Sequence, residues 1–214
     1  MRKEKLQELK RYFEEIKIIN SIKKESSGNF IKSEAYDFYL NNNRVITREK
    51  LIKGKNDGSA VIIIPTTSED EILTVIEPRV FTSNTLVSFP AGYIEQKEDK
   101  ENAARRELRE ETGYVSDKLI LLDSFYQDEG CSEAFNYIYL ALNCKKKYEQ
   151  NLDKDEIVKY MLFKYNELLE LEKMGYIKSG NAKLALNNLK TYRKGRYLWK
   201  NLMQKKKLKI LLIL

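Results

Sequence analysis

Residues 89–114 constrain the fold of this 214-residue chain more than any other stretch. They read FPAGYIEQKEDKENAARRELREETGY: an apolar strand that reaches Gly92, a polar loop, and an acidic helix predicted at about 102–112 and closed by Gly113. Seven carboxylates lie within residues 95–111. The segment is therefore either the solvated face of a surface helix or a site that holds metal.

Helical geometry places three of these acids on one face. At about 100° per residue, Glu107 and Glu111 lie about 40° apart, and Glu110 lies about 60° to the other side of Glu107. Carboxylates this close repel one another unless a cation lies between them, and Mg²⁺ prefers such oxygen ligands. From charge alone, however, neutralisation by the arginines of the same helix is the simpler explanation.

The rest of the chain predicts a mixed α/β domain. Strands, one helix, further strands and final helices follow one another without the regular alternation of a doubly wound sheet. We therefore expect a mixed sheet with helices on its faces, preceded by a small β appendage that ends near residue 56. The expected elements are a helix at 5–19, a hairpin around 41–43, strands at 59–65, 71–78, 85–92 and 156–163, two strands within 118–144, and helices at 165–175 and 179–194.

Composition excludes several kinds of chemistry. The chain has no histidine, which removes Ser-His-Asp and Cys-His catalysis, imidazole bases and His-liganded zinc. Its two cysteines, Cys131 and Cys144, form no disulfide framework and suggest a reducing compartment. The first residues lack the apolar core of a signal peptide, and the final KILLIL is far shorter than a membrane span. We expect a soluble cytoplasmic protein.

The net charge of +7 belongs to the end of the chain. Residues 190–214 contain nine Lys or Arg and no acid, which leaves 7 − 9 = −2 for residues 1–189. A basic tail can contact RNA, anionic lipid or nothing. A solvated tail at 191–214 is the simplest expectation.

The spacing of the acidic segment resembles the signature of the Nudix hydrolases, G-x5-E-x7-R-E-U-x-E-E-x-G-U, with U a bulky apolar residue. So many identities at fixed offsets make a chance match improbable. The resemblance implies a Nudix-type α/β/α sandwich. The matching residues are Gly92, Glu98, Arg106, Glu107, Leu108, Glu110, Glu111, Gly113 and Tyr114.

The resemblance also implies roles for these residues. It assigns metal-facing carboxylates to Glu107, Glu110 and Glu111, a backbone ligand to the Ala91 carbonyl, and Mg²⁺ as the metal, with Mn²⁺ as an alternative. The implied reaction is hydrolysis of a nucleoside diphosphate linked to a second moiety. Since histidine is absent, the general base must be a carboxylate.

The motif's other members have structural roles in this comparison. Gly92 lets the backbone turn out of the strand, and Gly113 ends the helix. Glu98 and Arg106 are expected to form a salt bridge that joins the loop to the helix rather than to contact substrate.

Outside the motif, the layout resembles the ADP-ribose pyrophosphatase branch of the family. The likeness covers the early hairpin, AVIIIP, EPR, FYQDEGCSE and DKDEIVKY. Arg79 falls where that branch uses an arginine against the substrate phosphates or ribose, and Tyr36 and Phe38 either stack on adenine or belong to the core. The branch implies cleavage of ADP-ribose to AMP and ribose 5-phosphate by a homodimer.

Two departures from that branch leave the base and the substrate open. Residues 127–130 read QDEG instead of a PSPG-like turn, and a lysine interrupts the acidic loop at 153–156. Glu156 is the predicted base, beside a catalytic role for Glu110. Glu133 is a predicted substrate-binding residue and an alternative base, as are the two aspartates of the acidic loop.

Three alternatives to ADP-ribose hydrolysis follow. The chain could act on another nucleotide, such as a different sugar nucleotide, a dinucleotide polyphosphate or a flavin nucleotide. It could be a non-catalytic nucleotide- or RNA-binding module, or it could hydrolyse RNA 5′ ends, although we do not expect a nucleic-acid partner. The predicted division is an appendage at 1–56 for dimerisation, a Nudix domain at 57–190 and a tail at 191–214.

Overall fold

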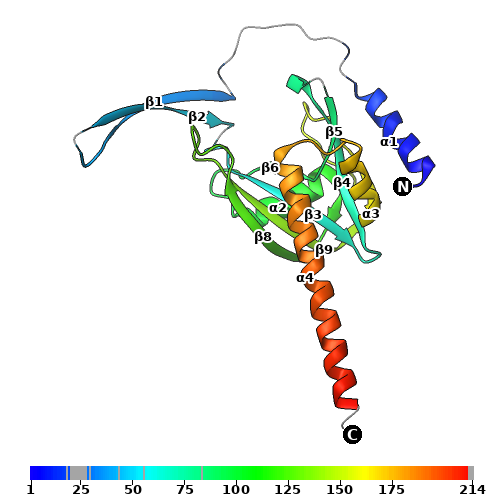
Figure 1. Cartoon of the computed structure of the whole chain (residues 1–214). Helices are drawn as coiled ribbons and strands as arrows, with labels where there is room; N and C mark the ends of the chain where they lie inside the picture. The colour runs from blue at the N-terminus through cyan, green and yellow to red at the C-terminus, as the bar shows by residue number, and fades with distance from the viewer. Residues whose placement is uncertain are drawn as a thin grey trace.

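The structure is a computed structural model that describes residues 1–17, 19, 28, 30–42, 44–54, 56–82 and 84–211, with backbone alone from 197 onward (Figure 1). Its helices and strands agree in order and type with those expected from the sequence, except that the strand expected at 85–92 is divided at 89–90 and that a two-residue strand at 114–115 was not expected. They are α1 (Lys3–Glu15), β1 (Ile31–Tyr39), β2 (Val45–Lys53), β3 (Ala60–Thr67), β4 (Glu71–Arg79), the 3-10 turn η1 (Val80–Thr82), β5 (Asn84–Ser88), β6 (Ala91–Tyr93), α2 (Lys100–Thr112), β7 (Tyr114–Val115), β8 (Lys118–Tyr126), β9 (Phe135–Lys146), β10 (Lys159–Lys164), α3 (Tyr165–Lys173) and α4 (Gly180–Leu211).

Strand β3 is the centre of an eight-stranded mixed sheet, in which five strands follow the order β10-β4-β3-β9-β7. The other three, β5, β6 and β8, pair with β4, β3 and β9, respectively. Strand β3 pairs in parallel with β9 and antiparallel with β4 and β6. Its alternate residues enter two different cores: Val61 and Ile63 pack on one face of the sheet, and Ile62 and Ile64 pack on the other. A strand that is buried on both faces needs the continuous apolar run that the sequence provides here.

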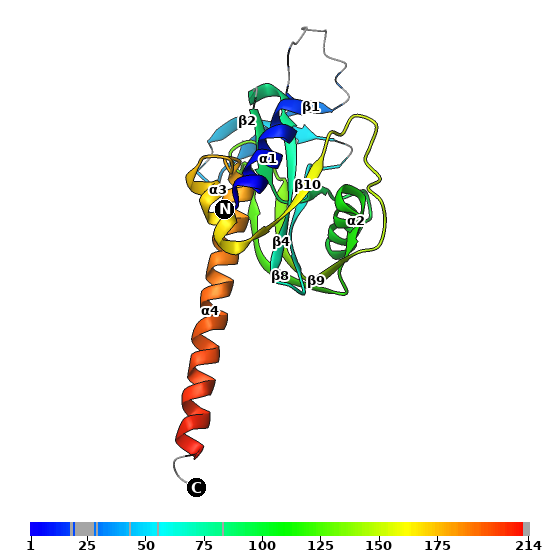
Figure 2. The ribbon, with the colours of Figure 1, turned by 90° about the vertical axis from the view of Figure 1, so that its right-hand side faces the viewer.

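The helices cover both faces of the sheet (Figure 2). On one face, Ala103, Ala104 and Leu108 of α2 pack against the core that contains Val61 and Ile63. On the other face lie α1, α3 and α4, as Figure 2 shows. The α/β/α sandwich expected from the sequence is confirmed.

The β1–β2 hairpin forms a separate two-stranded sheet that projects from the body (Figure 1). Every residue of β1 is exposed. The Leu51 N–H donates to the Cys131 carbonyl at 2.6 Å, and Lys50 forms an ion pair with Glu133. The hairpin therefore meets the body at the loop before β9.

Helix α1 packs on the body rather than with the hairpin. Leu9 is fully buried in the core beside α3 and α4. The ring of Phe13 packs edge-on against Tyr176, with 5.2 Å between centroids, and Lys5 Nζ donates to the Leu162 carbonyl of β10 at 2.8 Å. Because β10 is an edge strand, this helix covers part of an otherwise open sheet edge.

Helix α4 crosses position 191 without interruption and continues to Leu211, well past the helix end expected at 194. Its last turns extend away from the body in both views (Figures 1 and 2). No helix of the described residues is both long and apolar enough to cross a membrane. The division of the chain at residues 56 and 190 stays a prediction.

The burial of α1 predicts that Leu9→Ala destabilises the whole domain. Removing a fully buried leucine side chain costs about 2–5 kcal/mol when the cavity does not collapse. The measurement is urea unfolding, with Leu121→Ala on β8 as the matched control, since Leu121 is 47% exposed. Equal losses in the two variants would show that α1 does not dock in solution.

Candidate active site

Helix α2 is fixed at both ends by local interactions. Asp99 caps its start by accepting a hydrogen bond from the Glu101 N–H at 2.8 Å. Gly113 ends it in the left-handed conformation, with φ 72°, and its N–H donates to the Arg109 carbonyl at 2.7 Å. A side chain at position 113 would also overlap the Tyr148 carbonyl, so both conformation and space require glycine.

Gly92 lies directly against the carboxylate of Glu107. A Cβ atom at position 92 would overlap all three atoms of that carboxyl group. The glycine thus lets the helix approach β6 closely enough for Glu107, only 8% exposed, to face the backbone turn. The position of the Glu107 carboxylate therefore depends on the absence of a side chain at residue 92.

Glu111 lies one helical turn further along and is even more enclosed, at 5% exposure. Its Oε2 accepts a hydrogen bond from the Ala91 N–H at 3.2 Å. The structure therefore brings Ala91, Gly92, Glu107 and Glu111 together at the junction of β6 and α2.

Arg106 forms the loop-to-helix ion pair with Glu98 that the sequence predicts. Its Nε and Nη2 reach the two carboxylate oxygens of Glu98 at 2.9 Å each, and Nη2 also donates to the Tyr93 carbonyl at 2.9 Å. The remaining nitrogen, Nη1, contacts Glu107 Oε1 at 2.6 Å and Glu110 Oε2 at 3.1 Å. One guanidinium thus both locks the loop and partly neutralises two predicted metal ligands.

The electrostatics of the acids favour a bound cation. Burial raises the pKa of Glu107 to about 7, against the opposing effect of Arg106. Burial also raises the pKa of Glu111 well above its ordinary range, and the nearby charges of Glu77 and Glu107 add to this. A divalent ion among these oxygens would relieve both the desolvation and the repulsion.

Sequence reasoning missed Glu77. Strand periodicity places it on the same face of β4 as Leu73, which packs against α2. Burial raises the pKa of Glu77, and its charge acts on Glu111. It also forms an ion pair with Arg79, so the predicted substrate-binding arginine reaches the acidic cluster. The alternation along EILTVIEPR is the signal that could have found it.

Glu156 faces the same cluster from the loop before β10. Its charge contributes to the raised pKa values of Glu77, Glu107 and Glu111. Its Oε2 accepts a hydrogen bond from the Asp153 N–H at 3.0 Å, which holds the carboxylate within its own turn.

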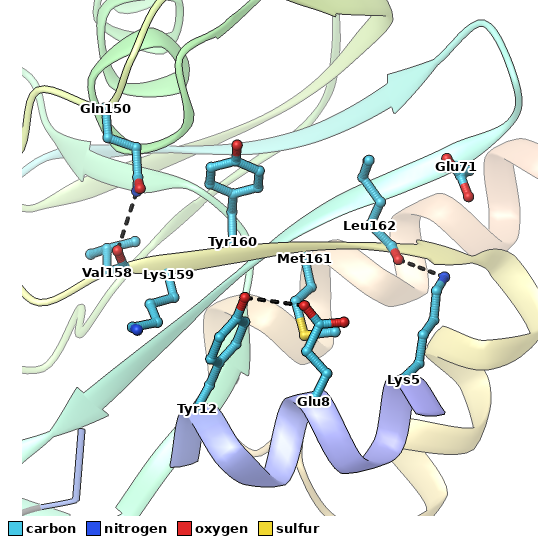
Figure 3. Close-up of a pocket in the computed structure, with 10 residues that line it drawn as sticks. All are labelled: Lys5, Glu8, Tyr12, Glu71, Gln150, Val158, Lys159, Tyr160, Met161 and Leu162. Carbon is cyan, nitrogen blue, oxygen red and sulfur yellow. Dashed lines mark hydrogen bonds between the residues drawn. The ribbon is translucent and has the colours of Figure 1, made fainter. Parts of the chain in front are cut away.

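Gln150 anchors the loop that carries Glu156. Its Nε2 donates to the Glu111 carbonyl at 2.5 Å and to the Val158 carbonyl at 3.2 Å, the second of which Figure 3 shows. The cavity in Figure 3, of about 700 Å³ between α1 and β10, contains none of the predicted site residues. This cavity is therefore distinct from the acidic cluster.

Glu133 lies elsewhere, beside the hairpin. It pairs with Lys50 and lines a cavity of about 540 Å³ together with Tyr36 and Phe38. The charge of Glu133 acts on Tyr36 and Lys50, whereas the charge of Glu156 acts on the buried acids of α2. The structure thus separates this predicted residue from Glu156, the other candidate base.

The donor set fits a hard divalent ion, although no complete cage is preformed. Among the described residues, no group of three or more His, Cys, Asp or Glu side chains is already arranged to hold a metal. Instead, Arg106 bridges Glu107 and Glu110. Carboxylate and backbone carbonyl oxygens are nevertheless the ligands that Mg²⁺ and Mn²⁺ prefer.

Comparison with known proteins agrees with this geometry. A model of the NUDIX domain matches residues 57–183. The chain therefore belongs to the Nudix family, and it is a Nudix hydrolase.

Two relatives in sequence and one solved structure are similar to this chain over most of its length. The chain is 34% identical over 146 residues to an ADP-ribose pyrophosphatase of Bacillus subtilis, covering 68% of this chain and 77% of the relative. It is 32% identical over 164 residues to a methanol dehydrogenase activator of Bacillus methanolicus, covering 76% and 86%. A crystal structure of an ADP compounds hydrolase superimposes with a TM-score of 0.67 over 83% of this chain and 92% of that chain; at 20% identity, it supports the fold alone.

The close approach at Gly92 predicts that Gly92→Ala weakens metal binding without unfolding the protein. The added methyl group must displace the Glu107 carboxylate, and therefore the oxygens it offers to a cation. Isothermal titration with Mg²⁺ or Mn²⁺ measures the loss, which we expect to be on the order of tenfold or more. Gly180→Ala is the control, because a Cβ there meets nothing within 4 Å. Unchanged affinity in Gly92→Ala would contradict this account.

The raised pKa of Glu107 predicts how stability depends on pH in the absence of metal. Its carboxyl has a pKa of about 7 in the folded protein, against 4.5 for an unperturbed glutamate. Between these values the folded state binds more protons than the unfolded state, so stability falls as pH rises, by about 3 kcal/mol for this group. Glu111 acts in the same direction.

Unfolding in EDTA across this pH window tests that prediction. Glu107→Gln should flatten the dependence, whereas Glu149→Gln, an exposed acid outside the cluster, should leave it unchanged. Saturating Mg²⁺ should also reduce the slope, because the metal competes with the proton. A wild-type protein whose stability did not fall with pH would refute the assignment.

Proposed function

We propose that this chain hydrolyses the pyrophosphate bond of ADP-ribose, giving AMP and ribose 5-phosphate, with a divalent metal. The observation that carries the proposal is the convergence of the α2 carboxylates with Glu77 and Glu156 around the Gly92 turn. Similarity to an ADP-ribose pyrophosphatase over most of the chain supports the choice of substrate.

The acids Glu107, Glu110 and Glu111, with the Ala91 carbonyl, would hold Mg²⁺, for which Mn²⁺ can substitute. When bound, the metal stabilises charge on the transferring phosphorus and lowers the pKa of an attacking water. An acidic protein surface needs this neutralisation before it can accept a pyrophosphate. The repulsion among the acids thus becomes a source of affinity for the metal.

Glu156 is the proposed general base. It comes from the loop before β10, whereas the proposed metal-binding carboxylates come from α2. Its charge acts on Glu77, Glu107 and Glu111. Its oxygen can accept the proton of a water directed at phosphorus. Asp153 and Asp155, in the same loop, are the alternatives.

Arg79 is the proposed phosphate ligand. Its guanidinium is half exposed and is held at the cluster by Glu77, so it presents free N–H donors next to the acids. Glu133, Tyr36 and Phe38 line the separate cavity of about 540 Å³, whose aromatic rings suit an adenine base. In this arrangement, the scissile bond would lie between the contacts to adenine and ribose on one side and the metal on the other.

A homodimer built through the hairpin would complete the assembly. Several large apolar side chains of the hairpin and its borders are exposed, which is unusual for a surface that faces only water. A symmetric pair of hairpins could cover them. The exposed residues are Phe30, Ile31, Tyr36, Phe38, Tyr39, Leu40 and Val45. A cytoplasmic location suits both the free cysteines and a nucleotide substrate.

The proposal predicts that Glu111→Gln and Glu156→Gln impair turnover of ADP-ribose in different ways. Loss of Glu111 should lower the apparent affinity for metal as well as kcat, because it removes a ligand. Loss of Glu156 should lower kcat by about 10²–10⁴ at saturating metal, because it removes only the base. Phosphate release from AMP, coupled to a phosphatase, measures the rates, with exposed Glu149→Gln as the control.

A substrate panel of sugar nucleotides, dinucleotide polyphosphates and flavin nucleotides fixes the class of substrate. Faster turnover of one of these compounds than of ADP-ribose would change the proposed substrate and keep the mechanism. Equal rates for Glu111→Gln and the unmodified protein would refute the mechanism itself.

A further inference from the structure

The outer part of α4 is not explained by the active site. The helix first packs into the core through Ala182, Ala185, Leu186 and Leu189. Beyond these residues, it extends away from the body in both views (Figures 1 and 2). Residues 194–211 alone add about 27 Å of helix at 1.5 Å per residue. The match to the NUDIX domain ends before this part, at residue 183.

The body neutralises only the first cations of this segment. Lys190 pairs with Glu172 at 2.7 Å, and Arg193 makes a two-pronged contact with Asp70 at 2.8 and 2.6 Å. Lys194 and Arg196 are exposed and form no ion pair within the described residues. Five further lysines follow in the sequence, and no acid occurs between Lys190 and the end of the chain.

Apolar residues are interleaved with these cations. The sequence after Arg196 reads YLWKNLMQKKKLKILLIL and includes the only tryptophan of the chain, Trp199. The helix backbone that carries these residues as far as Leu211 extends away from the sheet in both views (Figures 1 and 2). Basic, acid-free helices with Trp and Leu are typical of segments that lie in the headgroup region of a membrane.

We propose that residues 190–214, the basic extension, bind the surface of a membrane that contains anionic phospholipid. Lysines near such a surface gain electrostatic free energy, and their long stems let the ammonium groups reach the headgroups while neighbouring apolar residues enter the acyl boundary. On RNA the cations would be satisfied, but the LLIL end would stay in water. Lipid accommodates both kinds of residue.

The attachment of the extension to the body gives this binding a consequence. The Lys190–Glu172 and Arg193–Asp70 pairs, with the buried leucines before them, join the outer helix to the catalytic domain without a flexible linker. Membrane binding would therefore fix the orientation of the enzyme at the membrane surface, because no flexible linker separates the outer helix from the catalytic domain.

Trp199 allows a test on the unlabelled full-length protein. Because it is the only tryptophan, its emission reports on the extension alone. We expect a blue shift on addition of phosphatidylcholine vesicles that contain phosphatidylserine, and none with phosphatidylcholine alone. The shift should weaken with added salt, since screening shortens the reach of the charges.

A charge variant and its matched control make the test specific. Lys205→Gln, Lys206→Gln, Lys207→Gln and Lys209→Gln together should lower vesicle partition several-hundred-fold, because each lysine contributes roughly fivefold. The control replaces four exposed lysines of the body that form no ion pair in the described residues: Lys118, Lys145, Lys178 and Lys183. It should partition nearly as the unmodified protein does. Both variants should keep the same thermal unfolding.

Two outcomes would overturn the proposal. Equal partition of the two variants would show that the basic extension does not drive binding. Salt-sensitive binding to single-stranded RNA without a response to anionic vesicles would assign the extension to nucleic acid instead. Neither outcome would affect the proposed hydrolysis, which is measured on a soluble substrate.

Discussion

The acidic side chains of Glu107 and Glu111 are buried where α2 meets the turn at Ala91 and Gly92, and the site depends on that burial. Taking carboxylates out of water costs free energy unless they are protonated, hydrogen-bonded or paired. Here the Ala91 amide and Arg106 provide only part of that compensation. The proposed divalent ion would compensate the remaining cost of burying these carboxylates.

The surrounding structure is organised to keep these acids in place. Gly92 leaves room for the Glu107 carboxylate, and the small residues Ala103 and Ala104 let α2 lie close to β3. The Glu98–Arg106 pair prevents the loop from moving away from the helix. Since Arg106 also touches Glu107 and Glu110, the same side chain joins the structural and the chemical parts of the motif.

Segments outside the NUDIX match extend the domain in three directions. Helix α1 covers the edge strand β10, which follows the loop that carries Glu156. The hairpin closes a cavity against the loop before β9. Helix α4 begins in the core and ends away from it. These three segments lie around the central sheet and, apart from the first turn of α4, outside the residues that match the NUDIX domain.

The sequence by itself determined the elements that depend on local patterns. The apolar run at 59–65 predicted a strand buried on both faces, and the acidic segment after Gly92 predicted the helix closed by Gly113. The strand and the helix follow from periodicity among residues close in sequence, whereas the Glu98–Arg106 pair followed from the resemblance of this segment to the Nudix signature.

Only the tertiary structure decided the contacts between distant segments. It brought Glu77 and Glu156 to the α2 acids, separated Glu133 from them, and packed α1 on the body instead of leaving it with the hairpin. Such contacts depend on how strands far apart in the chain pair and on which helix face is buried. No local sequence pattern determines these contacts, because they depend on the packing free energy of the whole domain.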